Sequence, residues 1–97
     1  MYGVVTHLRL RGPLAAAQAC RVEGELLDPL PATPGFRGMF VIRTGEAEVT
    51  VSHVWDAQAA AEAAVERFAT WVQVHLGHEL AGPVERRAGR ALGARQA

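Results

Sequence analysis

The chain has 97 residues, of which 49% are hydrophobic and 21% are charged, a composition typical of one globular domain. Ten Arg balance eight Glu and two Asp, so the formal net charge is zero. This balance argues against a nucleic-acid-binding module and against a polybasic helix on a membrane surface. The sequence shows no signal-peptide pattern and no apolar stretch of about 18 residues, so we expect a cytoplasmic protein without a membrane partner.

Rare and missing residue types limit the chemistry further. The single cysteine, Cys20, excludes an internal disulfide and a cysteine-built zinc site, and we interpret it as a small packing residue. The chain has no Asn, which removes one common catalytic amide. Because a chain this short buries only a modest part of its surface alone, we expect it to form an oligomer.

Residues 4–10 and 14–30 predict a strand followed by a helix. The first stretch alternates, which places two sets of side chains on opposite strand faces. One set is Val4, Thr6, Leu8 and Leu10, and the other is Val5, His7 and Arg9. In the second stretch the apolar residues recur at helical spacing until the prolines at 29 and 31 end the helix.

A β-hairpin is predicted next. Residues 36–43 and 47–55 are rich in β-branched and aromatic residues, and the Thr44-Gly45-Glu46 segment between them is typical of a short turn. Alternation in the second strand again defines two faces. One face carries Val49, Val51, His53 and Trp55, and the other carries Thr50, Ser52 and Val54.

A long amphipathic helix is predicted over residues 57–80, with Asp56 as its N-cap. Its apolar stripe follows the spacing i, i+3, i+4, i+7. The stripe consists of Ala61, Ala64, Val65, Phe68, Trp71, Val72, His75, Leu76 and Leu80. Gly82 and Pro83 end the helix, residues 84–92 predict a last short strand, and residues 93–97 form a tail.

The order strand–helix–strand–strand–helix–strand predicts one ferredoxin-like α+β domain over residues 1–92. In this fold a four-stranded antiparallel sheet carries both helices on one face. The opposite face has no cover, although the strand at 47–55 has apolar or small residues on both faces. We therefore expect a second copy of the chain to pack against the open face, so that two sheets lie face to face in a homodimer.

Three stretches carry a recurring pattern: PGFRGMFVIR at 34–43, EVTVSHVWD at 48–56, and the following helix with Trp71. The positions that match are Pro34, Gly35, Phe36, Gly38, Trp55 and Asp56. With these residues the chain resembles the antibiotic-biosynthesis-monooxygenase-like group of dimeric α+β barrels. The resemblance covers residues 1 to about 92 and implies a ferredoxin-like fold and a homodimer. The group includes cofactor-free oxygenases acting on aromatic polyketides or quinols, haem-degrading enzymes and proteins of unknown function.

The resemblance also implies active-site positions, from which this chain departs. The cofactor-free oxygenases of the group use an Asn, a Trp and a Tyr around the pocket. The haem-degrading members use an Asn on the first strand with a Trp and a His on a helix. Here the first-strand position corresponds approximately to His7, the only Tyr is Tyr2, and Trp71 and His75 lie on the predicted long helix.

We predict a ligand pocket between the sheet and the helix at 57–80. His75 lies near the middle of the apolar stripe, so we expect it to point at the sheet, where an imidazole could act as a base. His7 is the second candidate catalytic residue. The candidate ligand-binding residues are Trp71, Phe68, His53 and Trp55. The alternative is that these side chains belong to the core and that the histidines bond to backbone or carboxylate groups.

Two further groupings are weighed against plainer interpretations. His75 and His78 are three residues apart on one helix, but no carboxylate triad accompanies them, so we predict no metal site. Arg86, Arg87 and Arg90 could form an anion site. Because the net charge is zero, we interpret these arginines as a solvated face or a dimer contact.

The sequence leaves three functions open, and with them whether the protein is an enzyme. The first is a cofactor-independent monooxygenase acting on a small aromatic or quinone-type substrate, which would itself activate dioxygen once deprotonated. The second is a non-catalytic dimeric protein that binds a small hydrophobic or aromatic molecule in the same pocket. The third is a haem-binding or haem-degrading protein with His75 as the axial ligand.

Overall fold

The computed structural model describes residues 1–92 of the chain. The elements in chain order are β1 (Tyr2–Arg9), α1 (Ala16–Arg21), η1 (Val22–Leu27), η2 (Leu30–Ala32), β2 (Phe36–Gly45), β3 (Glu48–Trp55), α2 (Gln58–Leu76), η3 (Gly77–Glu79) and β4 (Glu85–Arg90). The predicted tail at 93–97 lies outside the described residues. Within residues 1–92 no helix combines the length and the apolar character needed to cross a membrane.

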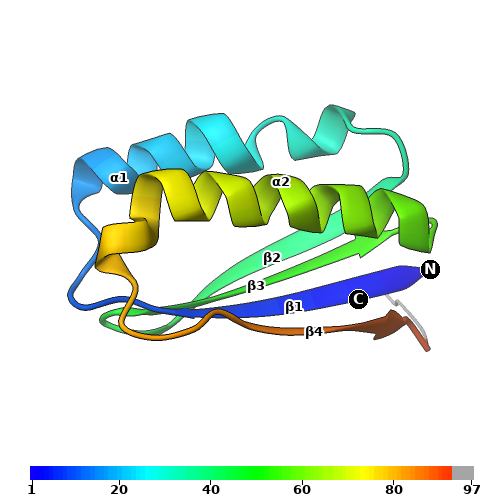
Figure 1. The fold of residues 1–97 in the computed structure, drawn as a ribbon. Helices are drawn as coiled ribbons and strands as arrows, with labels where there is room; N and C mark the ends of the chain where they lie inside the picture. The colour runs from blue at the N-terminus through cyan, green and yellow to red at the C-terminus, as the bar shows by residue number, and fades with distance from the viewer. Residues whose placement is uncertain (93–97) are drawn as a thin grey trace.

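The four strands form one antiparallel sheet in the order β2-β3-β1-β4. Both α-helices lie side by side over the same face of this sheet (Figure 1). This arrangement is the ferredoxin-like α+β fold that the element order predicts.

The prediction of one continuous α-helix over residues 14–30 is wrong. Only Ala16–Arg21 is α-helical; the next six residues form the π-helical segment η1, and the 3-10 turn η2 follows at Leu30–Ala32. Proline has no N–H to donate, so Pro29 and Pro31 prevent an α-helix from continuing here. The α1 helix is alanine-rich and contributes no buried residue.

Two smaller predictions also need correction. Strand β2 extends to Gly45, which pairs with Glu48, so the hairpin turn lies at Glu46 and Ala47 and not at residues 44–46. Asp56 does not cap α2: the extended residue Ala57 occupies the N-cap position, and the Asp56 carboxylate instead forms an ion pair with Arg37.

Gly35 fixes the approach of the β2 strand to the start of α2. It has a φ of 86°, a region that L-residues with a side chain rarely adopt. A Cβ atom at this position would lie 3.2 Å from the Cβ of Ala60, and the Gly35 carbonyl accepts a hydrogen bond from Asp56 N at 2.8 Å. A glycine is therefore required where the connection from η2 turns into the sheet.

The core lies between the sheet and α2, and strand alternation selects its residues as predicted. Side chains of β1 and β3 that face the helices are buried. The larger cluster consists of Val4, Leu26, Leu30, Val51, Trp55, Ala61, Ala64 and Phe68, and a smaller one of Leu8, Val72 and Leu76. Because the two clusters meet along α2, this helix holds most of the apolar layer together.

The opposite face of the sheet is open and partly apolar. Val5, Phe40 and Ile42 point away from the helices and are 44%, 72% and 53% exposed. The strand register places Val5 beside Ser52, and Ser52 beside Phe40, so these side chains form one continuous row across three strands.

Candidate functional site

A cavity of about 190 Å³ lies between the sheet and the helices. Its walls are almost entirely aliphatic or aromatic. The sheet contributes Thr6, Leu8, Val41, Val49, Val51 and Arg86, and α2 contributes Phe68, Ala69, Val72, Gln73 and Leu76. The remaining walls are Val22, Leu26 and Leu27 of η1 with Leu10, Leu14, Leu80 and Val84 of the connecting segments. A largely apolar space of this kind is suited to a small hydrophobic molecule.

Arg86 supplies the only ionised side chain among these lining residues. It projects from the edge strand β4 on the helix side of the sheet, in register with the buried Thr6. Its Nε atom is buried and has no hydrogen-bond partner within residues 1–92. A buried N–H group that donates no hydrogen bond lowers the stability of the fold, and more so when it carries a charge. The Arg86 Nε atom is therefore available to an anionic or carbonyl oxygen of a ligand.

The prediction that Arg86, Arg87 and Arg90 together form a solvated face or a dimer contact is wrong for Arg86, because the three side chains do not share one face of the sheet. Successive residues of a strand point to opposite faces, so Arg86 lies beneath α2 whereas Arg87 lies on the open face of the sheet. Arg90 shares the side of Arg86 but is exposed. The alternation of side chains along β4 separates Arg86 from Arg87, but only the register with β1 shows that Arg86 is the one on the side of the cavity.

His53 is buried beside this site. Its side chain is 1% exposed and stacks on Phe68, with ring centroids 5.2 Å apart and an interplanar angle of 12°. Trp55 Nε1 donates a hydrogen bond of 2.6 Å to His53 Nδ1. Because an indole nitrogen can only donate, Nδ1 must be unprotonated, and the neutral ring carries its proton on Nε2.

Burial lowers the pKa of His53 to about 4, and the positive charge of Arg86 acts in the same direction. His53 is thus neutral near pH 7. Phe68, which stacks on it, is the one predicted ligand-binding residue that lines the cavity. His53 and Trp55 do not line the cavity, and Trp55 is fully buried with its ring edge-on to Phe36.

His75 does not point at the sheet. The positions of α2 that face the sheet are Ala61, Ala64, Phe68, Val72 and Leu76, whereas Trp71 and His75 are half-buried beside them. The two rings lie against each other with centroids 4.5 Å apart. Neither residue lines the cavity between sheet and helices.

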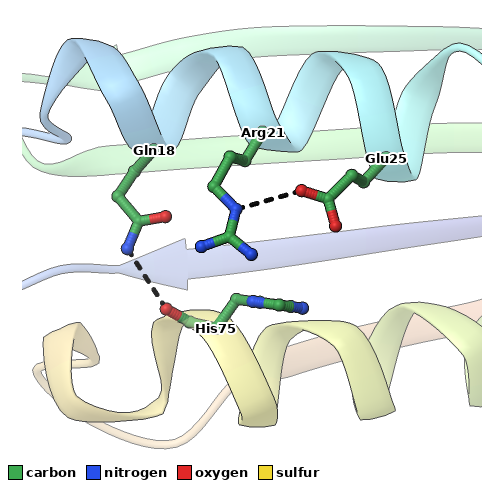
Figure 2. Close-up of polar contacts among 4 residues, drawn as sticks. All are labelled: Gln18, Arg21, Glu25 and His75. Carbon is green, nitrogen blue, oxygen red and sulfur yellow. Dashed lines mark hydrogen bonds and ion pairs between the residues drawn. The ribbon is translucent and has the colours of Figure 1, made fainter.

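The His75 side chain lies between the two helices, on the same side as Arg21 and Glu25 (Figure 2). Gln18 Nε2 donates a hydrogen bond to the His75 carbonyl oxygen at 3.3 Å. Arg21 Nε donates to the Glu25 carboxylate at 3.0 Å; this bond holds the pKa of Glu25 below its usual value, and the nearby His75 adds to the effect. The Gln18 bond joins α1 to α2, and Arg67 of α2 donates a hydrogen bond to the Glu25 carbonyl oxygen of η1 at 3.4 Å.

His7 lies on the open face of the sheet, opposite the cavity. It is half-buried, and its Nδ1 atom is 2.9 Å from Thr50 Oγ1. The structure therefore does not bring His7, His53 and His75 together. His7 lies on the open face of the sheet, His53 on the face that the helices cover, and His75 between the two helices. The catalytic roles of His7 and His75 stay predictions.

The remaining candidates are placed as follows. Cys20 is exposed on α1, so its interpretation as a small packing residue is wrong. His78 is exposed in η3. Within residues 1–92 no group of three or more His, Cys, Asp or Glu side chains could hold a metal ion.

No protein-family model and no curated protein matches the chain. Solved structures match it over almost the full length. A monooxygenase from the gene ActVA-Orf6 of Streptomyces coelicolor, in complex with nanaomycin D, is 20% identical with a TM-score of 0.69, covering 99% of this chain and 91% of that one. SnoaB of Streptomyces nogalater, named a cofactor-independent oxygenase, is 17% identical with a TM-score of 0.67, covering 99% of this chain and 94% of that one.

A third structure, from Caulobacter crescentus, bears the name of an antibiotic biosynthesis monooxygenase. It is 22% identical with a TM-score of 0.74, and the match covers 95% of this chain and 90% of that one. The chain therefore has the fold of the antibiotic-biosynthesis-monooxygenase-like proteins, which confirms the fold that the sequence resemblance implies.

We predict that His53 makes the stability of the protein depend on pH. Below about pH 6.5 an unfolded chain binds a proton at this residue, whereas the folded chain does so only near pH 4. The free energy of unfolding should therefore fall as the pH is lowered through this range, by roughly 1–2 kcal/mol after allowance for solvent screening. Urea unfolding curves between pH 7.5 and 4.5 measure it.

The His53→Gln variant keeps an acceptor for Trp55 but does not titrate, so its pH dependence should be flatter. The exposed His78→Gln variant is the control and should retain the slope of the unmodified protein. An unchanged slope in His53→Gln would show that His53 titrates normally in the folded state.

Proposed function

We propose that the protein is a cofactor-independent monooxygenase acting on a small aromatic or quinone-type substrate held in the cavity between the sheet and α2. One observation carries this proposal: an apolar cavity of about 190 Å³ in which Arg86 is the one ionised residue among the described lining residues, with a buried Nε atom that has no partner within residues 1–92. The names of ActVA-Orf6 and SnoaB support it as an analogy at the level of the fold.

The apolar walls and the guanidinium of Arg86 would bind different parts of the substrate. The aliphatic side chains and Phe68 would surround the rings of the substrate. Transfer of these apolar rings from water into the cavity is favourable. Its oxygen would accept a charge-assisted hydrogen bond from Arg86 Nε. Because a cation within about 4–6 Å favours the ionised form of an acid, Arg86 would lower the pKa of a bound phenol and hold it as the phenolate.

A phenolate is electron-rich at the carbon para to its oxygen, so it can react with dioxygen without a cofactor. One oxygen atom bonds to that carbon through a hydroperoxide. The carbon then loses its hydrogen, the hydroperoxide O–O bond breaks, and the second oxygen atom leaves as water with the phenol proton and that hydrogen. Phenol and dioxygen thereby give a quinone and water, with dioxygen as the oxidant.

A non-catalytic binding protein is the alternative. It is favoured by the composition of the cavity, because none of its described lining residues is Asp, Glu, His, Cys or Tyr, the usual proton-transfer groups. The proposed enzyme would therefore depend on Arg86 and on the acidity of the substrate and not on a general base.

We expect the protein to convert 1-naphthol to 1,4-naphthoquinone, with one dioxygen consumed for each quinone formed. Arg86→Gln should lower kcat/KM roughly tenfold to hundredfold, because it removes the charged hydrogen bond that stabilises the phenolate oxygen of the substrate. The measurements are quinone absorbance and an oxygen electrode. Arg90→Gln, an exposed arginine on the same strand, is the matched control and should keep full activity.

Binding of 1-naphthol without oxygen uptake would contradict the enzyme and support the non-catalytic alternative. Equal activity in Arg86→Gln and Arg90→Gln would contradict the role given to Arg86.

We further propose that the protein acts as a homodimer joined through the open face of the sheet. The support is the apolar row of Val5, Phe40 and Ile42 on that face, which in one copy is exposed to water. A second copy related by a two-fold axis would cover it with the same residues.

Light scattering after size exclusion should therefore give twice the 10.4 kDa mass of the chain. Phe40→Glu should weaken the dimer at least about tenfold, because it places two charges in an apolar interface. Val74→Glu changes an equally exposed apolar residue on α2 and should leave the dimer intact. A monomeric wild-type protein, or a dimeric Phe40→Glu variant, would contradict this interface.

A further inference from the structure

A π-helical segment forms one wall of the cavity. In η1 the hydrogen bonding spans five residues: Asp28 N donates to the Glu23 carbonyl at 2.8 Å. Three side chains of this segment, Val22, Leu26 and Leu27, line the cavity together. The opposite wall is formed by Phe68, Val72 and Leu76 of α2.

The wide turn is what brings Leu27 into this wall. Each residue of an α-helix turns by 100°, so Val22 and Leu27 would lie about 140° apart and Leu27 would face away from Val22. A π turn is wider than an α turn because its hydrogen bond joins residues five apart, which brings the first and sixth side chains toward the same side. Leu27 is accordingly half-buried against the cavity, beside the fully buried Leu26.

The size of the cavity is set by these walls. Its volume of about 190 Å³ is only about a quarter larger than the roughly 150 Å³ of an apolar cavity that accommodates benzene. Arg86 and Thr6 lie at the sheet wall, so a bound anionic group would occupy part of this space as well.

We infer that the protein selects anionic aromatic molecules of one ring or two fused rings, and that Leu27, held in the wall by the π turn of η1, sets this upper limit. The inference rests on the proposed function, because it takes the same cavity and the same Arg86 as the binding site. It adds the size and charge class of the ligand and the residue that determines it.

The test is a series of three probes that share a carboxylate and differ in ring number: benzoate, 2-naphthoate and anthracene-2-carboxylate. Their dissociation constants are measured by calorimetry at about pH 7.5 for wild type, Leu27→Ala, Leu27→Val and Val74→Ala. We expect wild type to bind the first two and to bind anthracene-2-carboxylate at least about tenfold more weakly.

Leu27→Ala should improve anthracene-2-carboxylate binding about tenfold and change benzoate binding little, with Leu27→Val in between. Val74→Ala removes an exposed apolar side chain and should match wild type. Leu27→Val removes one carbon only, so it reports on the limit even if the alanine variant is unstable.

The failures of the two proposals are distinguishable. If wild type binds none of the three probes, the cavity is not the proposed anion site and the proposed function fails. If wild type binds anthracene-2-carboxylate as tightly as 2-naphthoate, or if both Leu27 variants keep the wild-type order, the site stands and the size limit at Leu27 is overturned.

Discussion

The whole arrangement depends on how unevenly two helices fill the apolar layer over one face of the sheet. The 19-residue helix α2 buries five side chains in this layer, whereas the six-residue α1 buries none. Protein interiors are normally close-packed, so a layer closed on one side by exposed alanines leaves space unless other side chains fill it. The π turn of η1 supplies Val22, Leu26 and Leu27 and closes that side without filling it. A cavity large enough for a small ligand is the consequence.

Arg86 is the one ionised side chain among the described residues that line the cavity. The buried Arg86 Nε atom has no acceptor in the described part of the chain, which lowers stability. The neighbouring imidazole of His53 cannot compensate, because it is neutral and its Nδ1 atom already accepts a hydrogen bond from Trp55. A ligand oxygen that accepts a hydrogen bond from Arg86 Nε would remove this cost. In our account this stored cost favours binding of an anion over a neutral molecule of the same shape, and it links the binding site to the proposed deprotonation of the substrate.

The period-two pattern of the strands was sufficient to predict the sheet, its buried face and its open face, because neighbours such as His53 and Val54 must point to opposite sides. The site was harder to predict. The spacing of Trp71 and His75 places them in the apolar stripe of α2. Because this stripe is wider than the surface of α2 that contacts the sheet, the side chains at its edge lie toward α1. Arg86 is separated from Arg87 only by its register with Thr6, a long-range pairing, and the π turn has no local signature because propensities describe α-helices. The sequence predicts Asp56 as the cap of α2, but Arg37 of β2 forms an ion pair with the same carboxylate.

The central claim, that Arg86 anchors an anionic ligand inside the helix–sheet cavity, is tested most directly by nuclear magnetic resonance of the arginine Nε–Hε groups. Titration with 2-naphthoate should shift the Arg86 Nε–Hε signal in proportion to occupancy, because this buried donor gains its first acceptor, while the signals of the exposed Arg87 and Arg90 stay in place. A saturable binding curve in which the Arg86 signal does not move would place the ligand elsewhere and contradict the account.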